Sequence, residues 1–261
     1  MRFDVITLFP ELIEPYLKAG INRRAFESGQ VEVKLWPLRE HAIGNYRRVD
    51  DRPFGGGPGM VMLVEPLERA LAAIREDQQA AGAPSTPVAL FTPTGRVLQQ
   101  ADVRAWSRGE GTLGQGAVLL CGRYEGIDQR FIDRHVTHEI SLGDFVLSGG
   151  ELAAATVLDA LARLMPGVLT DASHEQDSFE NGLLDCPHYS RPEVLDDALG
   201  GLAVPEVLLS GHHVNIERWR REQSLRITWA RRPELIEAAR QDGRLSRKDE
   251  IFLDKLKAPQ L

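Results

Sequence analysis

Two short loops contain the glycines whose spacing could bring the chain backbone against a ligand. Residues 122–126 (GRYEG) follow an apolar run at 117–121, and residues 148–150 (SGG) close the segment 138–147. Because glycine has no side chain, backbone at such loops can approach a ligand directly. If both preceding segments are parallel strands, the loops lie at the carboxyl edge of a sheet, where open α/β folds bind ligands. The alternative is a pair of tight turns with no binding role.

A third glycine-rich stretch lies in the polar loop at residues 37–59. Its glycines (FGGGPG, 54–59) come directly after Asp50, Asp51 and Arg52. Such a loop can surround a phosphate, but no Gly-Lys-Ser/Thr follows it, so it is not a nucleoside triphosphate loop. We expect a mobile loop that faces RNA or covers a ligand. The alternative is a surface loop with no binding role.

Charge is distributed unevenly along the 261 residues. The whole chain has a net charge of −7, yet residues 214–261 contain 12 Lys and Arg against 8 Asp and Glu. Within that region, residues 216–232 interleave six arginines with Trp219 and Trp229. A basic region beside an acidic body indicates nucleic-acid contact, although the arginines could also form a solvated helix face. We expect the tryptophans to form the core of a small helical domain.

Alternating strands and helices position these loops. Apolar runs predict strands at 3–9, 31–36, 88–91, 117–121 and 138–147, and periodicity predicts helices at 11–18, 22–28, 65–79, 98–106 and 151–165. This alternation favours an α/β domain with a mostly parallel sheet. A turn is expected at 92–95, and the glycine-rich stretch 107–116 is expected to be a flexible insertion.

The pattern stops after residue 168. Residues 169–190 are polar and acidic and predict a flexible linker, and residues 191–261 predict a small helical domain with helices at 216–232, 233–240 and 246–256. The chain has only two cysteines and shows neither a secretory signal nor a long apolar run. We therefore expect a cytoplasmic protein with no membrane partner.

Five motifs occur in order along the chain: VDDRPFGGGPGM (49–60), LCGRYEGID (120–128), SLGDFVLSGGE (141–151), DSF (177–179) and LLDCPHYSRPE (183–193). Together they resemble the bacterial tRNA (guanine-N1)-methyltransferases of the TrmD family, in the SPOUT class. That family methylates the guanine at position 37, beside the anticodon. The sequence departs from the family pattern in its long insertion 107–116 and at Gln129, where an acidic residue is common.

The resemblance implies a fold, a cofactor and partners. It implies a SPOUT-type α/β catalytic domain with a trefoil knot at residues 1–168, which binds S-adenosylmethionine. It also implies that the flexible linker 169–190 carries a catalytic residue, and that the helical domain 191–261 binds tRNA. Members act as homodimers in the cytoplasm. The resemblance also implies a requirement for Mg2+.

The reaction implied by the resemblance needs a base and a cation. Guanine N1 holds a proton at neutral pH, so a carboxylate within reach must remove it. The negative charge that develops on O6 needs a cation or hydrogen-bond donors. The motif match assigns the base to Asp177 and the cation to Arg163. The alternative for Arg163 is an arginine favoured at a helix C-terminus by the helix dipole.

The resemblance also supplies the binding residues. Glu125 could hold the donor's amine or Mg2+, although hard cations want several oxygen ligands. Contact with the target tRNA is assigned to Asp50, Asp51, Arg52 and Ser173. Two other activities stay open: modification of another RNA position, such as a ribose 2′-hydroxyl, and RNA binding without catalysis. The residues assigned to the methyl donor are Thr92, Pro93, Gly95, Gly122, Tyr124, Glu125, Leu142, Gly143, Asp144, Phe145, Val146, Leu147, Gly149 and Gly150.

Overall fold

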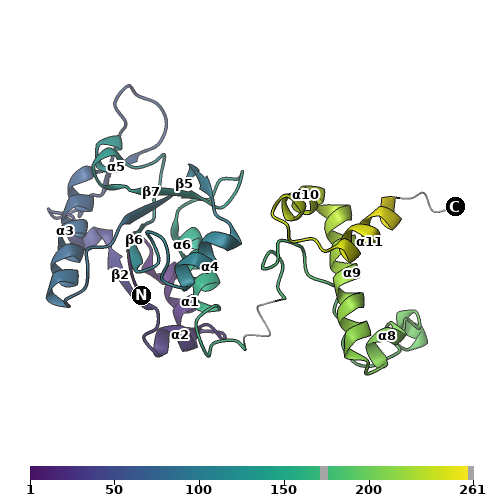
Figure 1. The fold of residues 1–261 in the computed structure, drawn as a ribbon. Coiled ribbons are helices and arrows are strands. Elements are labelled where there is room, and N and C mark those ends of the chain that lie inside the picture. The colour runs from purple at the N-terminus through teal and green to yellow at the C-terminus, as the bar shows by residue number, and fades with distance from the viewer. Residues whose placement is uncertain (171–175, 258–261) are drawn as a thin grey trace. The chain divides into compact units, whose positions relative to one another are not determined.

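The structure is a computed structural model that describes residues 1–170 and 176–257. It consists of two compact units, Met1–Thr170 and Asp171–Leu261. Figure 1 shows a sheet with helices on both faces in the first unit and a group of helices in the second. Each unit is described by itself.

The first unit is built on a five-stranded parallel sheet with the order β2-β1-β6-β5-β7. A separate antiparallel pair joins β3 to β4. The expected α/β fold with a mostly parallel sheet is confirmed. The strands are β1 (Arg2–Thr7), β2 (Glu32–Pro37), β3 (Asp50–Asp51), β4 (Val61–Met62), β5 (Val88–Val97), β6 (Gly116–Leu120) and β7 (His138–Ser141).

The central strand β6 explains why an apolar run predicted this sheet. All of its residues are buried, which is typical of a parallel strand covered on both faces. Side chains alternate between the faces of a strand. Accordingly, Ala117 and Leu119 enter one hydrophobic core, and Val118 and Leu120 enter the other.

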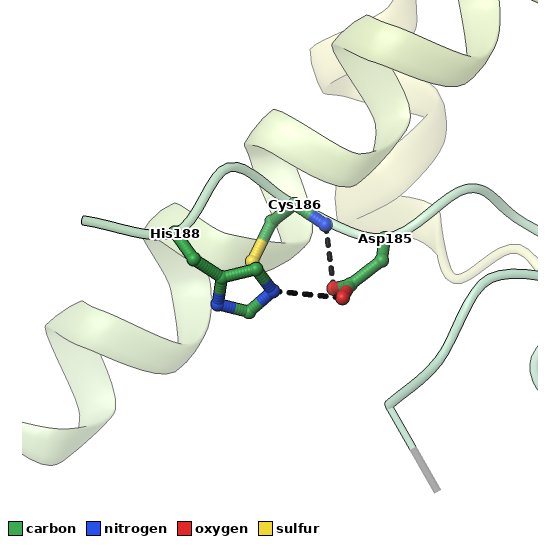
Figure 2. Close-up of side chains that lie close together, drawn as sticks. All are labelled: Asp185, Cys186 and His188. Atoms are coloured by element: carbon green, nitrogen blue, oxygen red, sulfur yellow. Dashed lines mark hydrogen bonds and ion pairs between the residues drawn. The ribbon is translucent and has the colours of Figure 1, made fainter. Parts of the chain in front are cut away.

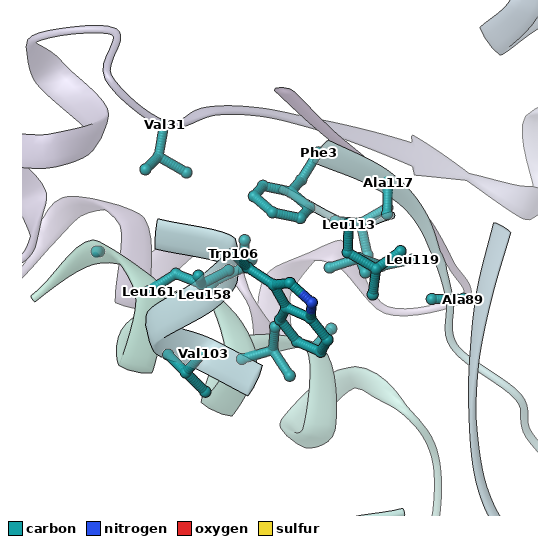
Figure 3. Packing of buried hydrophobic residues seen from close by; sticks show 14 of the residues in the cluster. Phe3, Val31, Ala89, Val103, Trp106, Leu113, Ala117, Leu119, Leu158 and Leu161 are labelled. Carbon is teal, nitrogen blue, oxygen red and sulfur yellow. The ribbon is translucent and has the colours of Figure 1, made fainter. Parts of the chain in front are cut away.

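Helices cover each face of the sheet (Figure 1). Leu67 and Ile74 of α3 and Phe131 of α5 pack in the core on one face. Val103 of α4 and Leu158 of α6 pack in the core on the other face, part of which is drawn in Figure 3. The helical segments are η1 (Pro10–Leu12), α1 (Glu14–Lys18), α2 (Arg23–Glu27), η2 (Leu38–His41), α3 (Val64–Ala80), α4 (Gln100–Ser107), α5 (Gln129–His135) and α6 (Glu151–Ala162).

The expectation of a flexible insertion at 107–116 is wrong. Leu113 is only 2% exposed and lies in the same core as Trp106 and Phe3 (Figure 3). A Cβ atom on Gly114 would lie 2.4 Å from the carbonyl oxygen of Glu110, so the turn is tightly folded. Its glycines therefore permit a compact turn that delivers one leucine to the core.

The segment around residues 92–95 also differs from the expected turn. Strand β5 continues to Val97, but its pairing with β7 shifts register between Phe91 and Arg96. Both of these residues align with Ile140, so the intervening residues form a bulge. Strand β7, by contrast, ends at Ser141, and residues 142–147 follow as a loop.

The second unit contains η3 (Asp197–Leu199), α8 (Glu206–Leu209), α9 (His213–Arg231), α10 (Pro233–Gln241) and α11 (Arg247–Lys257). Its core consists of Leu183, Leu225, Ile236, Ala239 and Leu253. The tryptophans do not belong to this cluster: Trp229 is 37% exposed, and Trp219 packs its ring against Tyr189 at 6.2 Å. The expectation of a tryptophan core is therefore wrong.

Part of the segment expected to be a linker packs on α9. The backbone N–H of Leu184 donates to Thr228 Oγ1 at 2.9 Å, and its carbonyl accepts from the Ser224 hydroxyl. Leu183 is 1% exposed. In the structure, Leu183 and Leu184 are thus fixed to the helices of the second unit. Among the described helices of either unit, none combines the length and the apolar character needed to cross a membrane.

Candidate active site

A cavity of about 600 Å3 lies at the bulge of β5 and at the carboxyl ends of β6 and β7. Its wall is made by the bulge of β5, the loop after β6 and the segment from Leu142 to Gly150. Parallel strands that are neighbours in a sheet end at the same edge of it. The loops that follow these strands therefore lie together, although they are distant in sequence. The cavity occupies the position that the glycine loops predicted for a ligand.

Most of the residues assigned to the methyl donor line this cavity. Gly95 and Asp144 do not. A Cβ atom on Gly95 would lie 2.5 Å from the backbone of Glu139 and Ile140, so this glycine permits close approach of β5 to β7. The assigned residues that line the cavity are Thr92, Pro93, Gly122, Tyr124, Glu125, Leu142, Gly143, Phe145, Val146, Leu147, Gly149 and Gly150.

The two glycine-bearing loops are in direct backbone contact. The N–H of Gly150 donates to the carbonyl of Gly122 at 2.9 Å. A Cβ atom on Gly150 would lie 2.7 Å from Cys121 Cα, which real Cβ atoms do not tolerate. Gly150 therefore lets one loop pass against the other, so this glycine serves chain packing whatever its part in ligand contact.

A buried ion pair, absent from the sequence-based assignments, joins the same loops. Arg123 Nε donates to Glu151 Oε2 at 2.8 Å, and Glu151 is fully buried. The other carboxylate oxygen accepts from the Thr7 hydroxyl at 2.9 Å, and Arg123 also donates to the carbonyl of Ser148 at 3.1 Å. A buried charge is stable only when it is paired and hydrogen-bonded in this way. The feature of the sequence that could have predicted this ion pair is the single glutamate, Glu151, at the start of an otherwise apolar helix.

Tyr124 and Glu125 face both the cavity and the glycine-rich loop. Tyr124 has a positive φ of 61°, which few residues with side chains adopt. Burial raises the pKa of its phenol, and the charge of Asp50 raises that pKa further. Glu125 Oε2 accepts from the N–H of Met60 at 2.7 Å. In the described chain, these two residues link the cavity to the segment that precedes α3.

The residues assigned to the target base lie on the short hairpin β3–β4. Asp50 is aligned with Met62 and Asp51 with Val61. The Asp51 carboxylate accepts from the N–H of Arg52 at 2.7 Å and forms an ion pair with Arg48. The remaining assigned contact, Ser173, lies outside the described residues.

Arg163 and Asp177 belong to different units. Arg163 is the C-cap of α6 and is half-buried. Asp177 begins a turn in the second unit, in which the N–H of Phe179 donates to the carbonyl of Leu183 at 2.7 Å. Phe179 has a φ of 75° and is 40% exposed. Asp177 thus lies on a folded turn anchored by Leu183.

Comparison with known proteins identifies the family. Residues 1–238 match the family described as tRNA (Guanine-1)-methyltransferase TrmD. The chain belongs to the TrmD family. It is 66% identical over 257 residues to the tRNA (guanine-N(1)-)-methyltransferase of Leptothrix cholodnii, covering 98% of this chain and 99% of the relative. The corresponding protein of Methylibium petroleiphilum is 64% identical over 257 residues and 98% of both chains.

The cavity fits the methyl donor that TrmD chemistry implies. Its volume falls in the range of pockets that enclose small molecules. Its lining combines Gly122 and Gly143, which have no side chains, with the apolar residues Leu142 and Leu147 and with Thr92, which has a hydroxyl group. This combination suits a ligand with a flat base, a sugar and an aliphatic arm, as in S-adenosylmethionine.

Mg2+ does not fit the same residues. Mg2+ is usually held by one or two carboxylates together with waters and substrate phosphates, whereas Glu125 offers a single carboxylate that already accepts the Met60 N–H. In residues 1–170 and 176–257, the one group of three or more candidate ligands consists of Asp185, Cys186 and His188. Thiol and imidazole groups are not the ligands of Mg2+. No step of the reaction is therefore assigned to a metal.

That group is better explained as a hydrogen-bonded turn. The carboxylate of Asp185 accepts from the N–H of Cys186 at 2.6 Å and lies 2.8 Å from His188 Nε2 (Figure 2). Burial raises the pKa of the Cys186 thiol, and the charge of Asp185 raises it further. Since a thiolate is the form that binds metals, the raised pKa of this thiol disfavours metal binding. The motif LLDCPHYSRPE thus shapes the turn that leads to the core of the second unit.

Proposed function

We propose that this chain transfers a methyl group from S-adenosylmethionine to N1 of the guanine at position 37 of tRNA. The observation that carries the proposal is the cavity at the bulge of β5 and the ends of β6 and β7, lined by both glycine loops in a chain of the TrmD family. A methyl donor held by these loops would present its methyl group at one fixed place, and positioning is a large part of catalysis.

The donor, when bound, supplies an electrophilic methyl group, and the chain supplies the rest. Asp177 accepts the proton from guanine N1, so that N1 becomes nucleophilic. Arg163 balances the negative charge that develops on O6. The hairpin residues Asp50, Asp51 and Arg52 hold the base and its neighbours, and Ser173 joins them when tRNA is present.

The basic helices of the second unit bind the tRNA backbone. Arg218 and Arg221 are paired with Glu222 and Asp249, respectively. Arg220 and Arg231 are exposed and take part in no ion pair among the described residues, so they are available to phosphates.

The active form is a homodimer in the cytoplasm, and its catalytic domain contains a trefoil knot. Exposed apolar side chains on η1, α1 and α6 support the dimer: Leu12 is 40% exposed, Tyr16 51% and Leu152 45%. Because η1 lies against both α1 and α6, apolar side chains exposed on these segments can form the contiguous patch that marks an interaction site. The knot rests on membership of the TrmD family.

The test is the identity of the product. The purified protein is incubated with methyl-labelled S-adenosylmethionine and an unmodified tRNA transcript, and the tRNA is digested to nucleosides. Label in 1-methylguanosine supports the proposal. Label in a 2′-O-methylated nucleoside would favour modification of another RNA position. Donor binding without any labelled nucleoside would favour a protein that only binds RNA.

A further inference from the structure

The carboxylate of Glu125 lies directly against Gly59 in the glycine-rich loop. A Cβ atom on Gly59 would lie 1.7 Å from the carboxylate carbon of Glu125. Gly55, Gly56 and Gly57 also have positive φ values, yet nothing lies within 4 Å of a Cβ atom built on any of them. Gly59 therefore differs from its neighbours: it leaves room for one particular side chain.

Glu125 also binds both backbone polar groups of Met60. Its Oε2 accepts the Met60 N–H at 2.7 Å, and its own N–H donates to the Met60 carbonyl at 3.1 Å. The contact continues along the chain, since the Met62 N–H donates to Gly126 at 2.9 Å. The Met62 carbonyl accepts from the Asp128 N–H at 3.1 Å. Residues 60–62 are thus held by hydrogen bonds to the loop after β6, which lines the donor cavity.

The same residues carry the hairpin assigned to the target base. Met62 is aligned with Asp50, and Val61 with Asp51. A displacement of the loop at residues 122–126 would consequently be passed to Asp50 and Asp51 through β4. Of the residues in this connection, Tyr124, Glu125 and Gly126 line the donor cavity, whereas Gly59 and Met60 do not.

We propose that Glu125 is a positioning residue that fixes the glycine-rich loop through Gly59 and Met60. By this contact, occupancy of the donor cavity orders the residues that receive the target base. The proposal rests on the proposed function, and it gives Glu125 a role other than binding a metal or the donor's amine. The chain would then meet its two substrates in a favoured order, with the donor ordering the loop before tRNA is held productively.

The contact is exposed to solvent, so its effect on stability is small and its effect on the loop is local. Gly59→Ala is the sharpest test, because the atoms that the new methyl group meets are the end of one flexible side chain. That side chain can swing away without unfolding the protein. The matched control is Gly56→Ala, which introduces the same strain at a φ of 77° instead of 81° but meets no atom.

Donor affinity without tRNA is measured by calorimetry. We expect Gly59→Ala and Glu125→Ala each to weaken the binding of S-adenosylmethionine roughly fivefold, the scale of one exposed hydrogen bond. Gly56→Ala should bind as the unaltered chain does. Since Gly59 and Glu125 act through one contact, the double variant should be no weaker than Glu125→Ala alone. Additive losses would overturn the proposal, as would equal losses in Gly59→Ala and Gly56→Ala.

Hydrogen exchange separates this role from a metal-binding or charge-dependent one. In the chain without donor, the Met60 amide should exchange slowly, and Glu125→Ala should expose it. Addition of S-adenosylmethionine should slow exchange across residues 50–60, and Glu125→Ala should abolish that response. Glu125→Gln keeps an acceptor oxygen, so it should preserve the slow exchange of the Met60 amide and the response to S-adenosylmethionine. If Glu125 acted as a metal ligand or as a charge partner, glutamine would not preserve them.

The outcomes for the two proposals are distinct. If the unaltered chain binds no S-adenosylmethionine, the proposed function fails, while the protection of Met60 by Glu125 can still be measured. If the donor binds but exchange at residues 50–60 is the same in Glu125→Ala, the positioning role is wrong and the proposed function stands.

Discussion

Arg123 and Glu151 are 28 residues apart in sequence and form an ion pair at 2.8 Å between Nε and Oε2. The carboxylate is fully buried and the arginine side chain is 15% exposed. Arg123 follows Gly122 in the loop after β6. Glu151 is the first residue of α6 and follows Gly150 directly. The pair therefore fixes the two walls of the cavity to each other.

Removal of Arg123 should destabilise the chain strongly, because the buried carboxylate of Glu151 loses its cationic partner and keeps only the hydrogen bond from Thr7. We expect Arg123→Ala to lower the free energy of unfolding by about 3 kcal/mol, as measured by urea denaturation. The control is Arg130→Ala, whose partner is Asp128 and whose side chain is 76% exposed. It should change stability by less than about 1 kcal/mol. Equal effects of the two substitutions would contradict the structural role of Arg123.

Neighbouring glycines in the second loop should respond differently to alanine. A Cβ atom on Gly149 would meet the Arg123 side chain at 2.1 Å, whereas on Gly150 it would meet Cys121 Cα at 2.7 Å. The Arg123 side chain can shift only by loosening its ion pair with Glu151, whereas the backbone of Cys121, packed in the core, cannot shift. We expect Gly150→Ala to abolish donor binding and Gly149→Ala to weaken it, both measured by calorimetry. A Gly150→Ala chain with unaltered affinity would show that the loops can separate without loss of the cavity.

Much of this arrangement can be predicted from sequence, and the remainder depends on contacts between distant residues. Apolar runs predict β1 and β6, and periodicity predicts α9. Helix α5 was missed because it is seven residues long and has one buried residue, with Asp128 as its N-cap. Gly95 is assigned to the donor with Thr92 and Pro93, as part of a turn at the end of a strand. The structure adds a second constraint on Gly95, because the backbone of β7 leaves no room for a Cβ atom there.

The burial of particular side chains was equally beyond sequence reasoning. The glycines around Leu113 resemble those of a flexible loop, yet the leucine fills a gap in the core beside Trp106. Trp219 and Trp229 were expected in the small core because large aromatic residues usually bury much area. Leucine and isoleucine from several helices fill that core instead.

Binding of tRNA should depend on salt through the exposed arginines of α9. We expect Arg220→Ala and Arg231→Ala each to reduce the slope of log affinity against log salt by about one, because each removes one phosphate contact. Arg218→Ala is the control, since Arg218 donates to Glu222 at 2.9 Å. Affinity is measured by filter binding over a series of salt concentrations. A slope that none of these substitutions alters would place the tRNA surface elsewhere.

Asp177→Ala should remove activity and spare donor binding. A general base contributes about 10²–10⁴-fold to rate, so single-turnover methyl transfer should fall within that range while calorimetry finds an unaltered donor affinity. If the active form is a homodimer in which Asp177 serves the donor cavity of the other subunit, mixing Asp177→Ala with Gly150→Ala chains should restore one site in each mixed dimer. Mixed dimers that stay inactive would mean that each chain uses its own Asp177.

The position of the transferred methyl group tests the central claim most directly. A tRNA transcript with guanine at position 37 and a matched transcript with adenine there are incubated with labelled S-adenosylmethionine, and the ribonuclease fragments are sequenced by mass spectrometry. The account predicts one methyl group, on N1 of guanine 37, and no methylation of the adenine transcript. Methylation of another nucleotide, or equal methylation of both transcripts, would contradict it.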